Sequence, residues 1–298
     1  MKNISTPVDN AWLSATGPVS IRMTNDYLFR ALLQRSNTTL RGLICSLLRL
    51  RDNEVISVEI MNPIDLGKSV AAKDFFLDIK VSLNGQIVVQ LEMQVINQYN
   101  WSERSLSYLC RTFDSLPVGK NYLSAKPVIQ IGLLNYTLFP EFPEFYAAYE
   151  FRNTKNHHLY SDKLRLCVLD LSRIDLATNE DKLHGIDYWA SLFKSTTWEE
   201  IKMLAKDNDS ISDAASAVYR LSQEEMVRLQ CEAREDYYRT QNDLKELMKR
   251  RDIKLAEQDA TIKKQDATIK EQDAAIKEKD ATIEKYLTIM AERGIQPE

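Results

Sequence analysis

The chain has 298 residues, of which 44% are hydrophobic and 28% charged, and its formal net charge is -4. This composition is typical of a globular protein, and the acidic balance argues against a protein that coats nucleic acid non-specifically, although it leaves room for a local basic cleft. No apolar run is long enough to span a membrane, and the N-terminus lacks the apolar core of a signal peptide. The four cysteines lie far apart without zinc-ligand spacing, so we expect a cytoplasmic protein with reduced thiols.

The predicted elements describe an α/β protein, because helical and strand-like segments alternate along the first part of the chain. After a leader at residues 1–21, Thr24 or Asn25 can cap a helix, and Asp26 favours its first turn. Hydrophobic periodicity then predicts helix to about residue 50, a strand at 55–63 and a hairpin at 75–95. A helix at 101–116 follows, and its inward residues are expected to be Leu106, Leu109, Cys110 and Phe113. The remaining predicted elements are a strand at 127–136, one or two strands up to residue 172, and helices from 179 to about 236. We therefore expect a mixed central sheet flanked by helices at residues 22–175, followed by a helical extension at 176–234.

A seven-residue repeat fills the C-terminal segment, which we expect to form a long helix or coiled coil at residues 235–293. One apolar position recurs every seven residues, and its members are Met248, Leu255, Ile262, Ile269, Ile276, Ile283 and Met290. The companion position three residues later is polar as far as Lys279. Strict seven-residue spacing is typical of a left-handed coiled coil, so residues 248–290 predict a homo-oligomer. A single helix stabilised by Asp–Lys pairs four residues apart is the alternative.

The predicted hairpin, FFLDIKVSLNGQIVVQLEMQV, carries one carboxylate on each strand, Asp78 and Glu92. Side chains alternate between the faces of a sheet, so the loop length decides whether the two acids share a face. A two-residue Asn-Gly loop would mix polar and apolar side chains on both faces. A three-residue loop at 84–86 pairs Leu83 with Ile87 and restores one apolar and one polar face. In that register Asp78 lies opposite Glu92.

Two facing carboxylates repel each other, so this register calls for a compensating charge. A divalent cation such as Mg²⁺ would supply it, because two carboxylates and a nearby carbonyl form a site of hard oxygen ligands. The pattern leaves two alternatives open. One is a solvent-exposed polar face on which Lys80 neutralises the acids. The other is a glycosidase that uses the two carboxyls as acid and base, although no aromatic sugar platform is evident.

Four motifs in order resemble those of the PD-(D/E)xK nuclease superfamily, and in particular its branch of Rpn-type recombination-promoting nucleases and transposases. They are DYLFR at residues 26–30, Asp78 followed by LEMQ at 91–94, RSLSYLCR at 104–111, and GKNYLSAKPVIQI at 119–131. The resemblance covers residues 22–175. It implies a restriction-endonuclease-like core that hydrolyses the phosphodiester bonds of DNA with Mg²⁺, or with Mn²⁺, as its cofactor.

The resemblance also implies which residues bind the metal ion. Asp78 and Glu92 would hold it together with the backbone carbonyl of Met93. Asp26 matches an acidic residue near the family's site and would bind a second ion or a metal-bound water. The alternative for Asp26 is a first-turn acid that the helix dipole favours.

Other residues would bind DNA or supply charge. Gln94 stands where the wider superfamily has lysine, and its amide can orient a water but carries no charge. Lys80 follows Asp78 by two residues on the same face, so we expect it to supply the missing positive charge. Arg104 and Arg111 lie seven residues apart on one helix face and are expected to bind DNA phosphates; a solvated surface is the alternative for both.

Two classes of function follow from these residues. The first is a metal-dependent DNA endonuclease of the recombination-promoting, transposase-like type, oligomeric through its tail. The second is a catalytically weak or inactive nuclease-fold module that binds DNA or a partner protein. Gln94, the acidic pI of about 5.6 and the tail favour this second class.

Overall fold

The computed structural model describes residues 10–64, 78–115, 119, 121–206 and 208–294 of the chain. Two compact units are present, Met1–Tyr238 and Arg239–Glu298. Within the described residues, none of the helices combines the length and the apolar character needed to cross a membrane.

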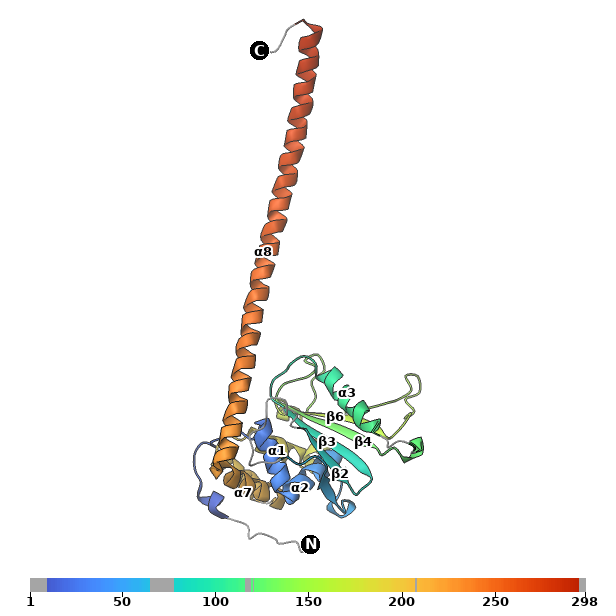
Figure 1. Cartoon of the computed structure of the whole chain (residues 1–298), viewed down its shortest axis with the longest axis vertical. Coiled ribbons are helices and arrows are strands. Elements are labelled where there is room, and N and C mark those ends of the chain that lie inside the picture. The colour runs from blue at the N-terminus through green and yellow to red at the C-terminus, as the bar shows by residue number, and fades with distance from the viewer. Residues whose placement is uncertain (1–9, 65–77, 116–118, 120, 207, 295–298) are drawn as a thin grey trace. The chain divides into compact units, whose positions relative to one another are not determined.

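A six-stranded sheet lies at the centre of the first unit, with the strand order β1-β2-β3-β4-β6-β5 (Figure 1). The neighbours β3-β4 and β4-β6 are parallel, whereas β1-β2, β2-β3 and β5-β6 are antiparallel. The strands are β1 (Val58–Ile60), β2 (Ile79–Leu83), β3 (Ile87–Gln94), β4 (Val128–Leu134), β5 (Tyr146–Glu150) and β6 (Leu164–Asp170). The predicted mixed sheet is confirmed, but the edge strand β5 was not expected.

Helices cover both faces of this sheet, with α1, α2 and α7 on one side and α3 on the other (Figure 1). The helices are α1 (Asp26–Arg35), α2 (Asn37–Leu48), α3 (Trp101–Phe113), α4 (Asn179–Leu183), α5 (Ile186–Lys194), α6 (Trp198–Ala205), α7 (Asp209–Gln223) and α8 (Glu225–Glu292), and short 3-10 turns occur at Asn10–Ser14, Asp52–Glu54, Tyr122–Ser124 and Ile174–Leu176. In the segment expected to be a leader, Trp12 is only 3% exposed and belongs to the main core.

The start of α1 is determined by its capping residue. The Asn25 side chain accepts hydrogen bonds from the backbone N–H groups of Tyr27 and Leu28 at 3.1 and 3.3 Å. These bonds satisfy two donors that have no partner within the helix. Asp26 is therefore the first helical residue, as expected from the sequence.

The hairpin of β2 and β3 has the predicted register, with Leu83 paired to Ile87. Asn84 and Gly85 both have positive φ angles, 52° and 68°, and the Gln86 N–H donates to the Leu83 carbonyl at 3.0 Å. Two successive left-handed residues make a type I′ turn rather than the type I turn that commonly begins such a loop. The three-residue loop thus places one set of side chains on each face.

The apolar face of the hairpin is buried, and the polar face is buried on β3 but only half-buried on β2. Ile79, Val81 and Leu83 face the main core and are at most 1% exposed. On the polar face, Gln90 and Glu92 are 1% and 4% exposed, because α3 packs across this side of the sheet. The polar face is therefore closed to solvent at Glu92 but partly open at Asp78 and Lys80, which are half-buried.

The docking of α3 depends on a glycine. Gly132 of β4 pairs with Glu92 of β3, and the ring of Trp101 lies where a Cβ atom of Gly132 would be. Trp101, Ser105, Leu109 and Thr112 are the buried residues of α3. Leu106 is 46% exposed and Cys110 is also exposed, so the prediction that they point inward is wrong; they lie on the stripe next to the one that contacts the sheet.

We expect Gly132→Ala to lower the free energy of unfolding by about 1–3 kcal/mol, because the added methyl overlaps the Trp101 ring in a packed layer. Chemical denaturation of both proteins measures the difference. Trp101→Leu in the Gly132→Ala background makes room for the methyl and should cost less than the sum of the two single changes. An unaltered stability of Gly132→Ala would contradict this packing of α3.

Candidate active site

Glu92 is a buried carboxylate whose two oxygens have different surroundings. Arg104 Nη2 lies 2.6 Å from Oε1, whereas Oε2 has no hydrogen-bond partner among the described residues. Burial raises the pKa of Glu92 to about 7; Arg104 opposes this rise, and the charges of Asp78 and Asp26 add to it. Asp78 and Asp26 are thus both close enough to Glu92 to act on it electrostatically.

Asp78 immediately precedes β2, and the strand register carries it opposite Glu92. Its backbone carbonyl accepts hydrogen bonds from Arg30 and from Asn62 Nδ2, the latter at 3.0 Å. Arg30 is 1% exposed and also donates to the carbonyl of Asn62. Arg30, the last residue of the DYLFR motif, therefore fixes the backbone that presents Asp78. The motif includes this arginine, but its contact lies 48 positions away and local pattern does not reveal it.

Asp26 is held by Arg234, a residue that the sequence analysis did not include in the site. Arg234 Nε lies 2.8 Å from Oδ1, and Nη2 donates to Oδ2, so the ion pair uses both carboxylate oxygens. The Asp26 N–H donates to the Tyr238 hydroxyl at 3.3 Å. Although burial alone would lower the pKa of Arg234, its hydrogen bond and ion pair with Asp26 raise it.

A cleft of about 190 Å³ brings several expected residues together. Its lining includes Asp26, Glu92, Met93, Gln94, Arg104 and Arg234, with Tyr237 and Tyr238. Gln94 is 9% exposed, and its Nε2 donates to the carbonyl of Ile96 at 3.1 Å. The cleft therefore holds two acids and two arginines around a neutral amide.

A second depression, of about 130 Å³, contains the other expected residues, Asp78, Lys80 and Arg111, together with Gln90, Tyr108 and Thr112. Helix α3 contributes to both hollows. Arg104 lies 5.5 Å from the centre of the Tyr108 ring, so Tyr108 connects the two sets of residues. The residues expected to form one site are thus divided between neighbouring hollows.

Side chains alone do not form a closed metal cage in the part of the chain that the structure describes, since no three His, Cys, Asp or Glu residues cluster there. Arginines contact Glu92 and Asp26 instead. A pair of carboxylates completed by a backbone carbonyl and water does not need such a cluster. Asp78, Glu92 and the Met93 carbonyl are the groups of this type that the family resemblance implies.

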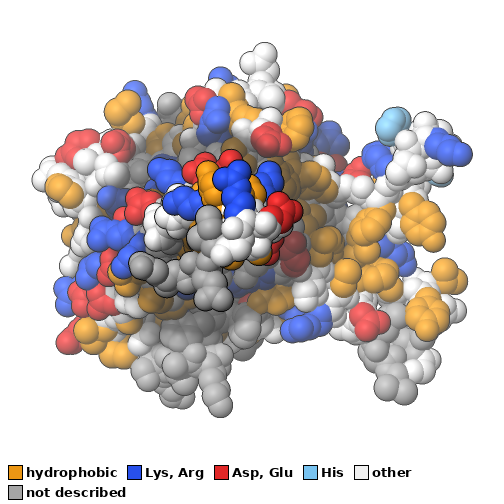
Figure 2. Space-filling model, turned by 90° about the horizontal axis from the view of Figure 1, so that it is seen from above, with side chains coloured by type: hydrophobic (Ala, Val, Ile, Leu, Met, Phe, Trp, Pro, Cys, Tyr) orange, Lys and Arg blue, Asp and Glu red, His pale blue; other side chains and the backbone are white. Residues whose placement is uncertain are grey.

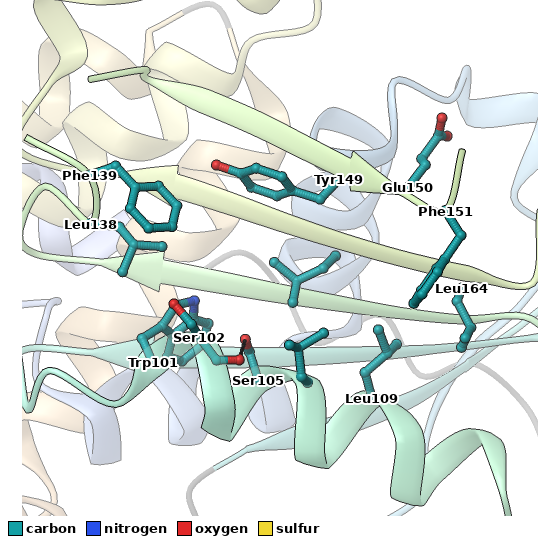
Figure 3. A pocket seen from close by; sticks show the side chains of 12 residues that line it. Trp101, Ser102, Ser105, Leu109, Leu138, Phe139, Tyr149, Glu150, Phe151 and Leu164 are labelled. Carbon is teal, nitrogen blue, oxygen red and sulfur yellow. Dashed lines mark hydrogen bonds between the residues drawn. The ribbon is translucent and has the colours of Figure 1, made fainter. Parts of the chain in front are cut away.

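A further hollow of about 260 Å³ lies against the opposite side of α3. Trp101, Ser105 and Leu109 extend from α3 toward it, and Tyr149 and Phe151 reach it from the β5 side (Figure 3). Hydrophobic side chains also gather on one side of the molecular surface in Figure 2. The carboxylate in the lining is Glu150, which pairs with Arg152 and Arg165. Its apolar lining makes this hollow unsuited to the chemistry of the acidic cleft.

A comparison with known protein families is consistent with this arrangement of acidic and basic residues. The model of the PD-(D/E)XK nuclease family transposases matches residues 23–249, which include both hollows beneath α3 and the part of α8 that carries Arg234. No curated protein and no solved structure matches the chain significantly. Nucleases of this superfamily act on DNA and generally use divalent metal ions. The chain belongs to the PD-(D/E)XK nuclease family transposases.

Proposed function

We propose that this protein is a metal-dependent DNA endonuclease with a recombination-promoting, transposase-like role. Glu92 is the observation that carries the proposal. It is 4% exposed, and only one of its oxygens has a partner in the described residues. A buried carboxylate that is half satisfied is costly to maintain, so its position in a cleft supports binding of a cation there.

The groups near Glu92 fit a hard divalent cation. Asp78, Glu92 and the Met93 carbonyl would hold Mg²⁺, because oxygen ligands suit that ion, and Mn²⁺ accepts the same ligands. The unpartnered Oε2 of Glu92 supports this fit. When bound, the ion would polarise a phosphate oxygen and lower the pKa of the attacking water.

The chain's own residues would bind and orient the DNA. Arg104 lies at Glu92 and presents a guanidinium, which can bind phosphate oxygens in a bidentate manner. Arg111 is exposed about two turns further along the same face of α3 and would extend the contact along the backbone of the DNA. Lys80 shares a hollow with Asp78 and would add positive charge, and Gln94 would orient a water.

A second candidate function rests on the ion pairs. Arg104 and Arg234 neutralise Glu92 and Asp26, and Gln94 lacks the charge of the superfamily's lysine. A nuclease-fold module that binds DNA or a partner protein without cleaving DNA would share these features. The two functions differ in their dependence on a metal ion.

The second unit supports self-association. Ile262, Ile269 and Ile276 are 53–55% exposed on α8 and continue the apolar seven-residue repeat. An apolar stripe of this length is stabilised when a second helix covers it. We propose a homo-oligomer through residues 248–290, with residues 22–175 as nuclease domain, 176–234 as helical extension and 235–293 as coiled coil. The four free cysteines and a DNA substrate support a cytoplasmic location.

Purified protein with Mg²⁺ or Mn²⁺ should nick or linearise supercoiled plasmid, and EDTA should prevent it. We expect Glu92→Gln and Asp78→Asn each to reduce the rate by more than about 100-fold, because each removes a charged ligand. Glu103→Gln removes an exposed carboxylate of α3 and serves as the matched control. Full activity in either site variant contradicts the assignment, whereas an inactive but folded wild-type protein favours the binding module.

Metal binding should also appear in the stability of the protein without DNA. A cation at 100 times its dissociation constant adds about 2.7 kcal/mol to the free energy of unfolding. We expect Mn²⁺ to raise the melting temperature of the wild-type protein and of Glu103→Gln, but not that of Glu92→Gln. An equal shift in all three proteins would place the cation elsewhere.

The proposed coiled coil can be tested on the apolar stripe. Ile262→Asp with Ile276→Asp places charges in the stripe and should convert the oligomer to a monomer in sedimentation velocity. Ala260→Asp with Ala274→Asp adds the same charges two residues earlier, on the outer side of the helix, and should leave the oligomer intact. A monomeric wild-type protein at micromolar concentration would exclude the coiled coil.

A further inference from the structure

Arg234 is one of the most tightly held charged groups of the cleft. It is 9% exposed, and its guanidinium contacts both oxygens of Asp26. The guanidinium carbon also lies 4.8 and 5.3 Å from the ring centres of Tyr237 and Tyr238. An arginine with a bidentate partner and two aromatic neighbours is held in one orientation by both.

Three hydrogen bonds near this ion pair connect the start of α1, including its capping residue Asn25, with the first part of α8. Asn25 Nδ2 donates to the Cys231 carbonyl at 3.1 Å and to Glu235 Oε1 at 3.2 Å, and the Asp26 N–H donates to the Tyr238 hydroxyl. The contacts connect residues more than 200 positions apart. Asp26 is therefore fixed in place by α8 as well as by its own helix.

The ion pair changes what Asp26 can do. A cation that used Asp26 as a ligand would have to displace a buried guanidinium from both oxygens and leave its charge without a partner, which is strongly unfavourable. Arg234 also stays charged at any pH at which the protein is folded. Asp26 thus neutralises Arg234 and is not a free ligand, in contrast to Glu92, which has an oxygen to spare.

The cleft has no charged side chain at the position where the wider superfamily has a lysine. Gln94 is neutral, and its amide nitrogen is committed to the Ile96 carbonyl. Arg234 lines the same cleft as Gln94 and Glu92 and carries a permanent positive charge. Arg234 lies beside Asp26, the carboxylate for which the resemblance implies a second ion or a metal-bound water.

We propose that Arg234 is a positioning residue that replaces a second metal ion: it holds Asp26, balances the charge of that carboxylate in place of an ion, and leaves a single divalent cation to bind at Glu92 and Asp78. The start of α8 is consequently part of the site. This inference rests on the proposed metal-dependent function. It further specifies that one metal ion binds per chain and that Arg234 takes the place of a second ion.

Counting bound Mn²⁺ on the full-length protein tests the inference without any cleavage assay. Free Mn²⁺ is measured by electron paramagnetic resonance while the protein is titrated. We expect about one ion per chain for the wild-type protein and about two for Arg234→Gln, because Asp26 then becomes available as a ligand. Arg234→Lys keeps a charge at this position and should return the count to about one.

Two further variants keep the result interpretable. Asp26→Asn combined with Arg234→Gln removes the released ligand and should again bind about one ion per chain. Arg35→Gln breaks an exposed ion pair between α1 and Glu224 and is the matched control for the loss of such a pair; its count should equal that of the wild-type protein. Circular dichroism checks that each variant is folded. If Arg234→Gln does not fold, Asp26→Asn alone tests the same point, because it should bind Mn²⁺ with the same count and affinity as the wild-type protein.

The outcomes separate this inference from the proposed function. Two ions in the wild-type protein, or one ion in folded Arg234→Gln, would overturn the role of Arg234 while plasmid cleavage and its loss in Glu92→Gln still stood. A wild-type ion that Asp26→Asn removes would also overturn it. Absence of both Mn²⁺ binding and cleavage in the folded wild-type protein would overturn the proposed function and the inference together.

Discussion

The contact between Arg104 and Glu92 is the interaction on which the arrangement of the cleft depends. A carboxylate at 4% exposure needs a partner, and only α3 supplies one at this point of the sheet in the described residues. The position of α3 depends in turn on Gly132, which leaves room for the Trp101 ring next to Glu92 in the ladder. The lack of a side chain at Gly132 on β4 therefore allows α3 to place Arg104 next to the Glu92 carboxylate on β3.

The two ion pairs of the cleft differ in kind. Glu92 and Arg104 are 12 positions apart, on a strand and the helix that follows it, and the pair leaves one carboxylate oxygen without a partner. Asp26 and Arg234 are 208 positions apart, and both oxygens are used. A half-satisfied pair can take a ligand at little cost, whereas breaking a complete buried pair leaves a charge without compensation. Of the two carboxylates paired with arginine, Glu92 therefore keeps one oxygen without a partner in the described residues, whereas both oxygens of Asp26 are used.

The sequence predicted what local chemistry decides. Alternation and the loop at Asn84-Gly85 were sufficient for the hairpin register, and the start of α1 was predicted to within one residue, with Thr24 or Asn25 as the cap. The edge strand β5 was missed because YAAYE has neither the β-branched residues nor the alternation of a strand; its pairing with β6 determines it. Arg234 was missed because nothing near it in the sequence indicates a partner on α1. Contacts of this length come from tertiary packing, which periodicity does not encode.

Helix α8 contributes both to the cleft and to the proposed self-association of the nuclease. In the first unit it contributes Arg234 and Tyr238 to the cleft, and in the second it carries the exposed apolar repeat. Each chain has one Glu92, so the proposed nuclease would cut one strand per site, and cleavage of both strands of a duplex would be faster if two chains were held together. In this proposal, association through the tail would govern whether DNA is nicked or broken, and the start of the same helix would complete each site through Arg234.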